Sequence, residues 1–309
     1  MRVAVAGSAI LDVIARPTSK VEVDSSNEGD IRVGAGGAAR NVAENLVRLG
    51  CRVTLVTDLA DDFPGRFLLD YIRGVGMEVR LSRRRRTGVY LALLHPDGTL
   101  DRGFCATGTE SVTPDEVLAA LPDLADFHGV VIDANLAGNV VGTLADRCRR
   151  LNIPYALETV AHERALRVLP AIPGCAFIKP DRAEARMLTG LPCGTRAEAA
   201  ACAGRLREIG AGTVIVSLGE DGFHMEHPEL SGHFPAAPAT VADVTGAGDA
   251  LFAAAFLALL KGLSPRQAAE AGRLAAALTV ACPTAVTPAV TPKLLDESFL
   301  DDSLAGERP

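Results

Sequence analysis

The sequence predicts an α/β protein built on one mostly parallel sheet with helices packed on it. Short apolar runs typical of buried strands alternate with segments of helical apolar spacing along most of the 309 residues. The composition agrees, because 48% of the residues are hydrophobic, 4% are aromatic and Trp is absent. A core of Ala, Val, Leu and Ile is typical of a parallel sheet covered by helices. We expect one large domain over residues 1–309.

The expected elements follow one another in βα order. Buried strands are predicted at 3–6, 53–56, 130–132, 155–157, 177–178 and 214–216, and helices at 38–49, 64–75, 114–121, 140–151, 182–188, 196–209, 250–260 and 265–281. Repeated βα units imply right-handed crossovers and a mostly parallel sheet. Ligands of such sheets bind at the carboxyl ends of the strands.

Two segments interrupt this order. Residues 13–35 and 87–105 alternate polar and apolar side chains, and a turn at Pro96-Asp97-Gly98 predicts a hairpin of 87–94 with 99–105. Together they predict a small sheet beside the main domain, suited to act as a lid. The acidic tail from Asp296 is expected to fray.

Bulk charge and cysteine usage restrict the function classes. The net charge is −7 and the pI is about 5.4, which disfavours nucleic acid and anionic membranes as partners. The seven Cys are scattered without a C-x-x-C pair, so we expect reduced thiols in a cytoplasmic protein. The apolar run at 250–260 is about half the length that spans a bilayer.

The motif Asp243-Val244-Thr245-Gly246-Ala247-Gly248-Asp249 directly precedes the apolar helix at 250–260. Small residues at a helix start expose backbone N–H groups, which together with the helix dipole bind anions. A carboxylate at such a site suggests a general base that takes a proton from a hydroxyl attacking a phosphoryl group. The alternative is that Asp249 merely caps the helix.

A second glycine-rich start lies near the first strand. Gly36 and Gly37 open the helix at 38–49, Asn41 lies one turn inside it, and Asp12 follows the first strand. Bare glycine backbone allows close approach of a ligand, and a carboxylate can accept from two neighbouring hydroxyls of a sugar. The alternative is an ordinary helix start with a solvated Asp12. Arg40 is expected either to pair with an acidic neighbour or to touch substrate.

These two constellations, about 200 residues apart, resemble the ribokinase-like (PfkB) carbohydrate kinases along nearly the whole chain. The resemblance implies a three-layer α/β/α domain with a small β-sheet lid. Within the family the chain is most similar to the pseudouridine kinases, through residues 36–45, 133–136 and 278–288.

The resemblance assigns roles to the motif residues. It implies that Asp249 is the general base toward a primary hydroxyl, that Gly246, Ala247 and Gly248 form the anion hole, and that ATP and Mg²⁺ are required. The ribose-bearing substrate would be held by Asp12, Gly36, Gly37, Asn41 and Asn135. The nucleotide would be bound by Lys179, Asp181, Glu184, Ser217, Gly219, Gly222 and Thr245. Glu184 would reach magnesium through water, Asp243 and Thr245 would hold a monovalent cation such as K⁺, and the lid would pair in a homodimer.

One position departs from the family pattern. The family often has Asn-x-x-Glu after Lys-Pro, whereas this chain has Asp181 in place of the Asn and keeps Glu184. The substitution adds charge near the triphosphate and puts the metal stoichiometry in question. Thr87 and Tyr90 of the hairpin are expected to meet the edge of a base. The run at 83–86 is expected to be a solvated strand edge, and His162 a partly exposed structural residue.

Three alternatives to a pseudouridine kinase remain at this point. The same chemistry could act on ribose, another sugar or an adenosine-type nucleoside. A silent sugar- or nucleoside-binding protein on the same fold is a second alternative, although a binder has no need of a base at position 249. A dinucleotide-dependent oxidoreductase is disfavoured, because the first strand leads into Gly7-Ser8-Ala9-Ile10-Leu11-Asp12 and not into a Gly-x-Gly-x-x-Gly turn.

Overall fold

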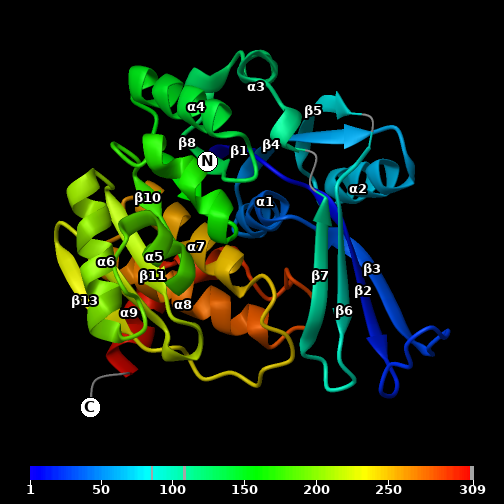
Figure 1. Cartoon of the computed structure of the whole chain (residues 1–309). Helices are drawn as coiled ribbons and strands as arrows, with labels where there is room; N and C mark the ends of the chain where they lie inside the picture. Colours follow the sequence, from blue (N-terminus) through cyan, green and yellow to red (C-terminus); the bar gives the residue numbers. More distant parts are fainter. Residues whose placement is uncertain (85, 107–108, 307–309) are drawn as a thin grey trace.

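A nine-stranded sheet forms the centre of the molecule (Figure 1). The computed structural model describes residues 1–84, 86–106 and 109–306, and the side chains at 81–84, 110, 162 and 306 lie outside that description. The strand order is β13-β12-β11-β10-β9-β8-β1-β4-β5. The parallel part consists of β1 (Arg2–Ala6), β4 (Arg52–Ala60), β5 (Glu78–Arg84), β8 (Gly129–Asp133), β9 (Tyr155–Glu158), β10 (Phe177–Ile178) and β11 (Thr213–Ser217). The strands β12 (Phe223–His227) and β13 (Leu230–Phe234) continue it antiparallel.

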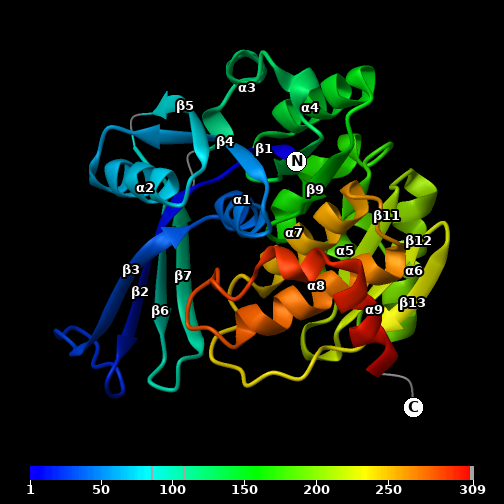
Figure 2. The ribbon, with the colours of Figure 1, turned by 180° about the vertical axis from the view of Figure 1, so that it is seen from behind.

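Helices cover both faces of this sheet, as Figures 1 and 2 show from opposite sides. One face carries α1 (Ala38–Arg48), α2 (Phe63–Gly74), α7 (Ala247–Leu260) and α8 (Pro265–Val280), and the other carries α3 (Pro114–Ala120), α4 (Gly138–Leu151), α5 (Arg182–Thr189) and α6 (Arg196–Ile209). Alternation along β1 serves both layers, because Val3 and Val5 pack into the first core and Ala4 and Ala6 into the second. The three-layer α/β/α architecture is therefore confirmed.

Helix α7 lies deepest among the helices that concern the site. Every residue from Ala250 to Ala258 is buried, so the helix is apolar on all sides, as a fully enclosed helix must be. It packs on α8 and α1. Its amino end is consequently held at a fixed place beside the sheet.

The small second sheet has the order β3-β2-β6-β7 and projects from one side of the large sheet (Figures 1 and 2). Its strands are β2 (Ile10–Pro17), β3 (Gly29–Gly36), β6 (Val89–Leu94) and β7 (Leu100–Ala106). We call it the lid sheet. The predicted lid is confirmed, and the structure extends its first strand back to Ile10. Asp12 is therefore a lid residue and does not belong to the main sheet.

Several elements were not predicted. They are β5, β12, β13, the 3₁₀ segment at His162–Ala171 and the last helix, α9 (Glu297–Gly306). The expected fraying from Asp296 is wrong for residues 297–306, because Leu300 is fully buried in the core and Ser303 donates a hydrogen bond to Glu270. None of the helices in the described ranges is long and apolar enough to cross a membrane.

The first two residues of the arginine run, Arg83 and Arg84, fall on the edge strand of the large sheet. Strand β5 is the last in the order, and Arg86 just after it is exposed. Two predictions concern positions outside the described residues. They are the solvated strand edge, for the side chains at 83 and 84 and for residue 85, and the partly exposed structural role, for the side chain of His162.

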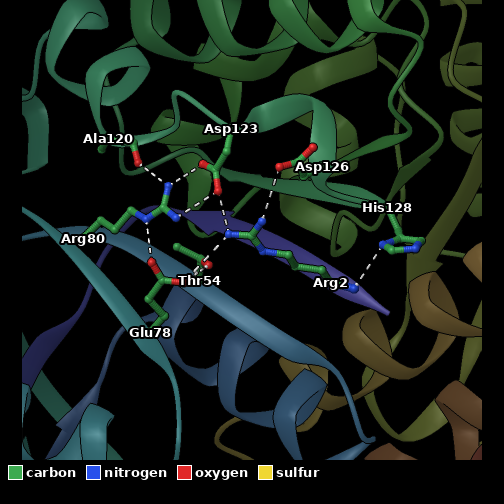
Figure 3. A network of polar contacts seen from close by, with 8 residues as sticks. All are labelled: Arg2, Thr54, Glu78, Arg80, Ala120, Asp123, Asp126 and His128. Carbon is green, nitrogen blue, oxygen red and sulfur yellow. Dashed lines mark hydrogen bonds and ion pairs between the residues drawn. The ribbon is translucent and has the colours of Figure 1, made fainter.

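A polar network joins the amino ends of β1, β4 and β5 to the chain before β8 (Figure 3). Asp123 accepts from Arg80 at 2.6 Å and from Arg2 at 2.6 Å, and Arg80 also donates to Glu78 at 2.8 Å. Arg80 holds the pKa of Asp123 well below its usual range, and Arg2 adds to this effect. The network therefore lies at the amino ends of the strands. Ligands of such sheets bind at the opposite, carboxyl ends.

Candidate active site

Polar side chains collect where the parallel strands end. Asp133 ends β8, Glu158 ends β9, Lys179 follows β10 and Ser217 ends β11. The amino end of α7 points at the same edge, since Gly248 lies beside the Lys179 ammonium. The sequence motifs, which lie far apart in the chain, are thus brought to one place.

The start of α7 requires glycine at position 246. Gly246 has φ of 80°, and a Cβ there would lie 1.9 Å from the carbonyl oxygen of Ala285. Asp243 accepts from the N–H of Thr245 at 2.8 Å in the turn before it. The first turn of any helix leaves N–H groups without intrahelical partners, so anion binding at this end stays a prediction that the geometry allows.

Asp249 does not cap α7. Gly246 is the N-cap residue, and α7 has no side-chain cap among the described residues. Instead the Asp249 carboxylate accepts a hydrogen bond of 2.6 Å from the side-chain amide of Asn41 in α1. Burial raises the pKa of Asp249 to about 6, against the lowering effects of Asn41 and Lys179. A carboxylate with this pKa is ionised at neutral pH and is basic enough to take a proton.

The second glycine constellation brings the lid to this carboxylate. A Cβ on Gly36 would lie 2.1 Å from the Asp12 carboxylate, and one on Gly37, with φ of 98°, would lie 2.5 Å from the carbonyl oxygen of Ser8. Burial raises the pKa of Asp12 to about 6; Arg40 lowers it in part, and Asp249 adds to the rise. The structure therefore brings together Asp12, Gly36, Gly37, Asn41 and Asp249, and their common role in substrate binding stays a prediction.

Arg40 belongs to the scaffold of this site. It is 2% exposed and donates to Glu44 at 2.6 Å and to the carbonyl oxygens of Ala35 and Gly36. Glu44 also accepts from Arg48 at 2.7 Å. Of the two expectations for Arg40, pairing with an acidic neighbour is the one observed, and this pairing fixes the end of β3 against α1.

A buried charge cluster lies behind the helix start. Burial alone would lower the pKa of Lys179, but Glu158, Glu184 and Asp249 raise it above the usual value. Burial raises the pKa of Glu158 to about 8, against the lowering effect of Lys179. A carboxyl group with this pKa is mostly protonated at neutral pH, so Glu158 does not act as a full negative charge beside the ammonium.

Asp181 and Glu184 form a capping box at the start of α5. Asp181 accepts from the N–H of Glu184 at 2.8 Å, and Glu184 accepts from the N–H of Asp181 at 2.9 Å. The same Glu184 oxygen accepts from Thr159 at 2.6 Å. Asp at position 181 thus performs the local capping role that an Asn would also perform.

Asn135 lies behind the open part of the site. It is 2% exposed, and its amide donates to Ser8 at 2.8 Å and accepts from Arg164 at 2.6 Å. Both ends of the amide are engaged within the protein. In this structure Asn135 organises the loop after β8 and does not face an open surface.

A cavity of about 670 Å³ opens on the other side of the α7 start. Its lining includes the predicted nucleotide residues Ser217, Gly219 and Gly222. It also includes Ala247 and Gly248 of the predicted anion hole. The remaining lining is mainly apolar: Phe223, Ala236, Ala237, Ala239, Val241, Val244, Leu251, Ala276, Ala277 and Val280. Thr245 is exposed in the turn nearby.

Sequence reasoning missed Glu158 and misplaced Thr87. Glu158 directly follows the strand predicted at 155–157, and that position was the available signal. One of its carboxylate oxygens is buried without a hydrogen-bond partner among the described residues. Thr87 is buried and donates to Asp62 at 2.7 Å while accepting from the N–H of Ala60. Thr87 is therefore a structural residue, and the expectation that it meets a base is wrong.

Comparisons with known proteins show which family model and which relatives the chain matches. The model of the pfkB family carbohydrate kinases matches residues 1–292. Guanosine-inosine kinase of Exiguobacterium acetylicum is 28% identical over 96% of this chain and 98% of its own length. Pseudouridine kinase of Escherichia coli (strain K12) is 27% identical over 81% of this chain and 81% of its own length.

Solved structures share the fold. A carbohydrate kinase from Agrobacterium tumefaciens superposes with a TM-score of 0.83 at 26% identity, over 97% of both chains. Arabidopsis thaliana ribokinase complexed with ribose and ATP superposes with a TM-score of 0.80 at 20% identity, over 96% of this chain and 98% of that one.

Proposed function

The chain belongs to the PfkB family of carbohydrate kinases, which transfer phosphoryl groups to an alcohol acceptor, and from this premise we propose its substrates. We propose that the protein, acting as a single domain, transfers the terminal phosphoryl group of ATP to the primary hydroxyl of a ribose-bearing small molecule. The first candidate acceptor is pseudouridine. The observation that carries the proposal is the Asp249 carboxylate, held by Asn41 at 2.6 Å in the first turn of α7.

Each residue has a role in this reaction. Asp12, beside the bare backbone of Gly36 and Gly37, holds neighbouring hydroxyls of the ribose. Asp249 takes the proton of the primary hydroxyl as its oxygen attacks, and Asn41 fixes the orientation of the carboxylate. The N–H groups at the start of α7 stabilise the negative charge that develops on the transferred group.

The donor side fits ATP with Mg²⁺. When bound, ATP with its magnesium ion supplies the phosphoryl group and neutralises part of its charge. The cavity beside Gly248 has the apolar lining that a planar base requires. Among the residues that the structure describes, no group of three or more His, Cys, Asp and Glu is placed to hold a metal alone. Magnesium commonly keeps its waters and uses one or two carboxylates, and Glu184 is our candidate for such a contact through water.

A monovalent cation and a homodimer are two further proposals. Asp243 and Thr245 form the turn that would hold the monovalent cation, such as K⁺. The lid face opposite Asp12 is apolar and exposed, with Ile31 at 67%, Val33 at 51% and Phe104 at 59%. We propose that a second copy of this chain covers this face, because the same strands can pair symmetrically. We also propose a cytoplasmic location, where free thiols such as the seven here persist.

The acceptor is tested by a coupled ADP-release screen over pseudouridine, uridine, guanosine, inosine, adenosine, ribose and fructose phosphates. Turnover of nucleosides with pseudouridine first supports the proposal. A preference for guanosine or inosine would assign the second candidate, which the similarity to guanosine-inosine kinase favours. ADP release with sugars alone would reject a nucleoside acceptor.

A further inference from the structure

One face of the lid sheet presents an aromatic ring beside the proposed ribose site. Strand pairing places Asp12 of β2 level with Tyr90 of β6, and Tyr90 level with Cys105 of β7. Residues that pair in register point to the same face of a sheet. Tyr90 and Cys105 therefore face the same space as the Asp12 carboxylate. Burial raises the pKa of the Tyr90 phenol, and Asp12 and Cys105 add to this rise, as neighbouring groups do.

The Tyr90 side chain lies across the neighbouring strand. A Cβ built on Gly103 would lie 2.8 Å from the phenol oxygen of Tyr90, 3.1 Å from Cε2 and 3.3 Å from Cζ. Gly103 is paired with Ala92, so the ring extends diagonally from its own row to the next one. A ring in this position lies along the sheet and does not stand away from it. Tyr90 is only half-buried, so part of the ring remains accessible.

On β6 and β7 the floor of this face is made of small residues around Tyr90. Gly34 and Cys105 lie in the same row as Asp12 and Tyr90, and the following row contains Ala92 and Gly103 on β6 and β7 beside Ile14 and Arg32 on β2 and β3. The opposite face of the same strands instead carries Val13, Leu91 and Phe104. Small residues around one aromatic ring leave room for a flat group over the ring, in continuity with the sugar held by Asp12.

We propose that Tyr90 is a specificity-determining residue, whose ring, supported by Gly103, is the platform on which the planar heterocycle of a nucleoside acceptor stacks. The inference deepens the proposed function and rests on it, because the ribose position at Asp12 sets where the heterocycle lies. Stacking on an aromatic side chain requires only a π-face, so the platform accepts pyrimidines and purines alike. It discriminates against acceptors that have the sugar and lack the ring.

The test compares two acceptors in the full-length enzyme. The kcat/KM values for pseudouridine and for methyl riboside, which lacks the heterocycle, are measured for wild type, Tyr90→Ala and Tyr90→Phe. Tyr90→Ala lowers the value for the nucleoside by about tenfold to a hundredfold, the range of one lost base stack. It leaves the value for methyl riboside within about threefold. Tyr90→Phe keeps the ring and retains the wild-type ratio of the two values.

Gly103 provides an independent perturbation. Gly103→Ala inserts a methyl group where the ring now lies, so it lowers the same ratio, and it has no further effect in the Tyr90→Ala background. Phe104→Ala is the matched control, because it removes an aromatic ring from the adjacent residue on the opposite face. Phe104→Ala leaves the ratio unchanged, whatever it does to the oligomeric state.

A second readout does not depend on turnover. Cys105 is exposed and lies beside Tyr90, whereas Cys282 is half-buried and distant in the sequence. Pseudouridine slows alkylation of Cys105 by iodoacetamide and leaves Cys282 unaffected, and methyl riboside protects neither thiol. In Tyr90→Ala the protection by pseudouridine is lost.

The outcomes separate the inference from the function beneath it. If nucleosides are phosphorylated and Tyr90→Ala lowers both kcat/KM values equally, or Cys105 is not protected, the platform is rejected and the kinase assignment stands. If wild type phosphorylates sugars and no nucleoside, the proposed acceptor fails and the platform fails with it. A Tyr90→Ala protein with a changed ratio and an unchanged melting temperature supports the inference.

Discussion

Replacing Asp249 by Asn is the most direct test of the proposed chemistry. The substitution removes the base and preserves the size of the side chain, and the new amide oxygen can still accept from Asn41. Loss of a positioned general base lowers kcat by about a hundredfold to ten-thousandfold. The KM for the acceptor should change little, because Asp12 and the backbone of Gly36 and Gly37 remain in place.

The same variant should not lose stability at neutral pH. The pKa of Asp249 is raised from 3.8 to about 6 in the folded protein, so the fold favours the protonated form. This contribution to the free energy of unfolding is fully present below the unfolded value and is lost as the pH rises through about 6. Above pH 6 the wild type therefore holds a charge that Asp249→Asn lacks. The melting temperature of the variant should equal or exceed that of wild type, although Lys179 loses one countercharge.

The assay is ADP release with saturating ATP, together with thermal unfolding between pH 5 and 8. Asp146→Asn is the matched control, since it removes an exposed carboxylate on α4 that pairs with Arg149, and it should match wild type in kcat. Two results would refute the reasoning. One is an Asp249→Asn enzyme within a few-fold of wild-type kcat. The other is a large fall in melting temperature, which would indicate that the carboxylate stabilises the helix start.

Three further predictions address the substrate side and the scaffold. The kcat/KM for the acceptor should fall below pH 6, and the slope of log kcat/KM against pH should approach two, because the pKa of both Asp12 and Asp249 is raised to about 6. In Asp12→Asn this slope should drop to one. An unchanged slope would place Asp12 outside the reaction. Gly36→Ala should raise the KM for the acceptor by about tenfold or more, because the new Cβ would lie 2.1 Å from the Asp12 carboxylate. This effect should not add to that of Asp12→Ala. Additive effects in the double variant would contradict a contact between position 36 and Asp12. Arg80→Ala should lower the melting temperature at pH 7 by a few degrees without changing kcat. Because the pKa of Asp123 is lowered in the fold, this loss of melting temperature should shrink as the pH falls below the unfolded pKa of Asp123, near 3.8. An equal loss at all pH values would indicate that Arg80 acts by packing alone.

The parallel part of the fold was predictable because its signals are local. Buried β-strands and amphipathic helices repeat with fixed periods, and these periods place β1, β8 and α4 within a few residues. Strands β12 and β13 gave no such signal, since they are short and carry His and Glu beside Phe and Met. Their pairing depends on Gly222, where a Cβ would lie 2.0 Å from the carbonyl oxygen of Phe234. A contact of this kind cannot be inferred from residue types.

The candidate site was predictable in its members and less so in its connections. The glycines and carboxylates carry the family resemblance, whereas the bond between Asn41 and Asp249 joins residues 208 positions apart. The role of a polar residue that flanks a motif is also ambiguous, because it depends on the partners that the fold brings near it. Arg40 lies three residues after Gly37, yet its guanidinium turns to Glu44 and to backbone carbonyls. A guanidinium that is almost fully buried must satisfy its donors, and the fold supplies the acceptors. The acceptors within reach of a side chain, and not its position beside a motif, therefore decide whether it serves the substrate or the scaffold.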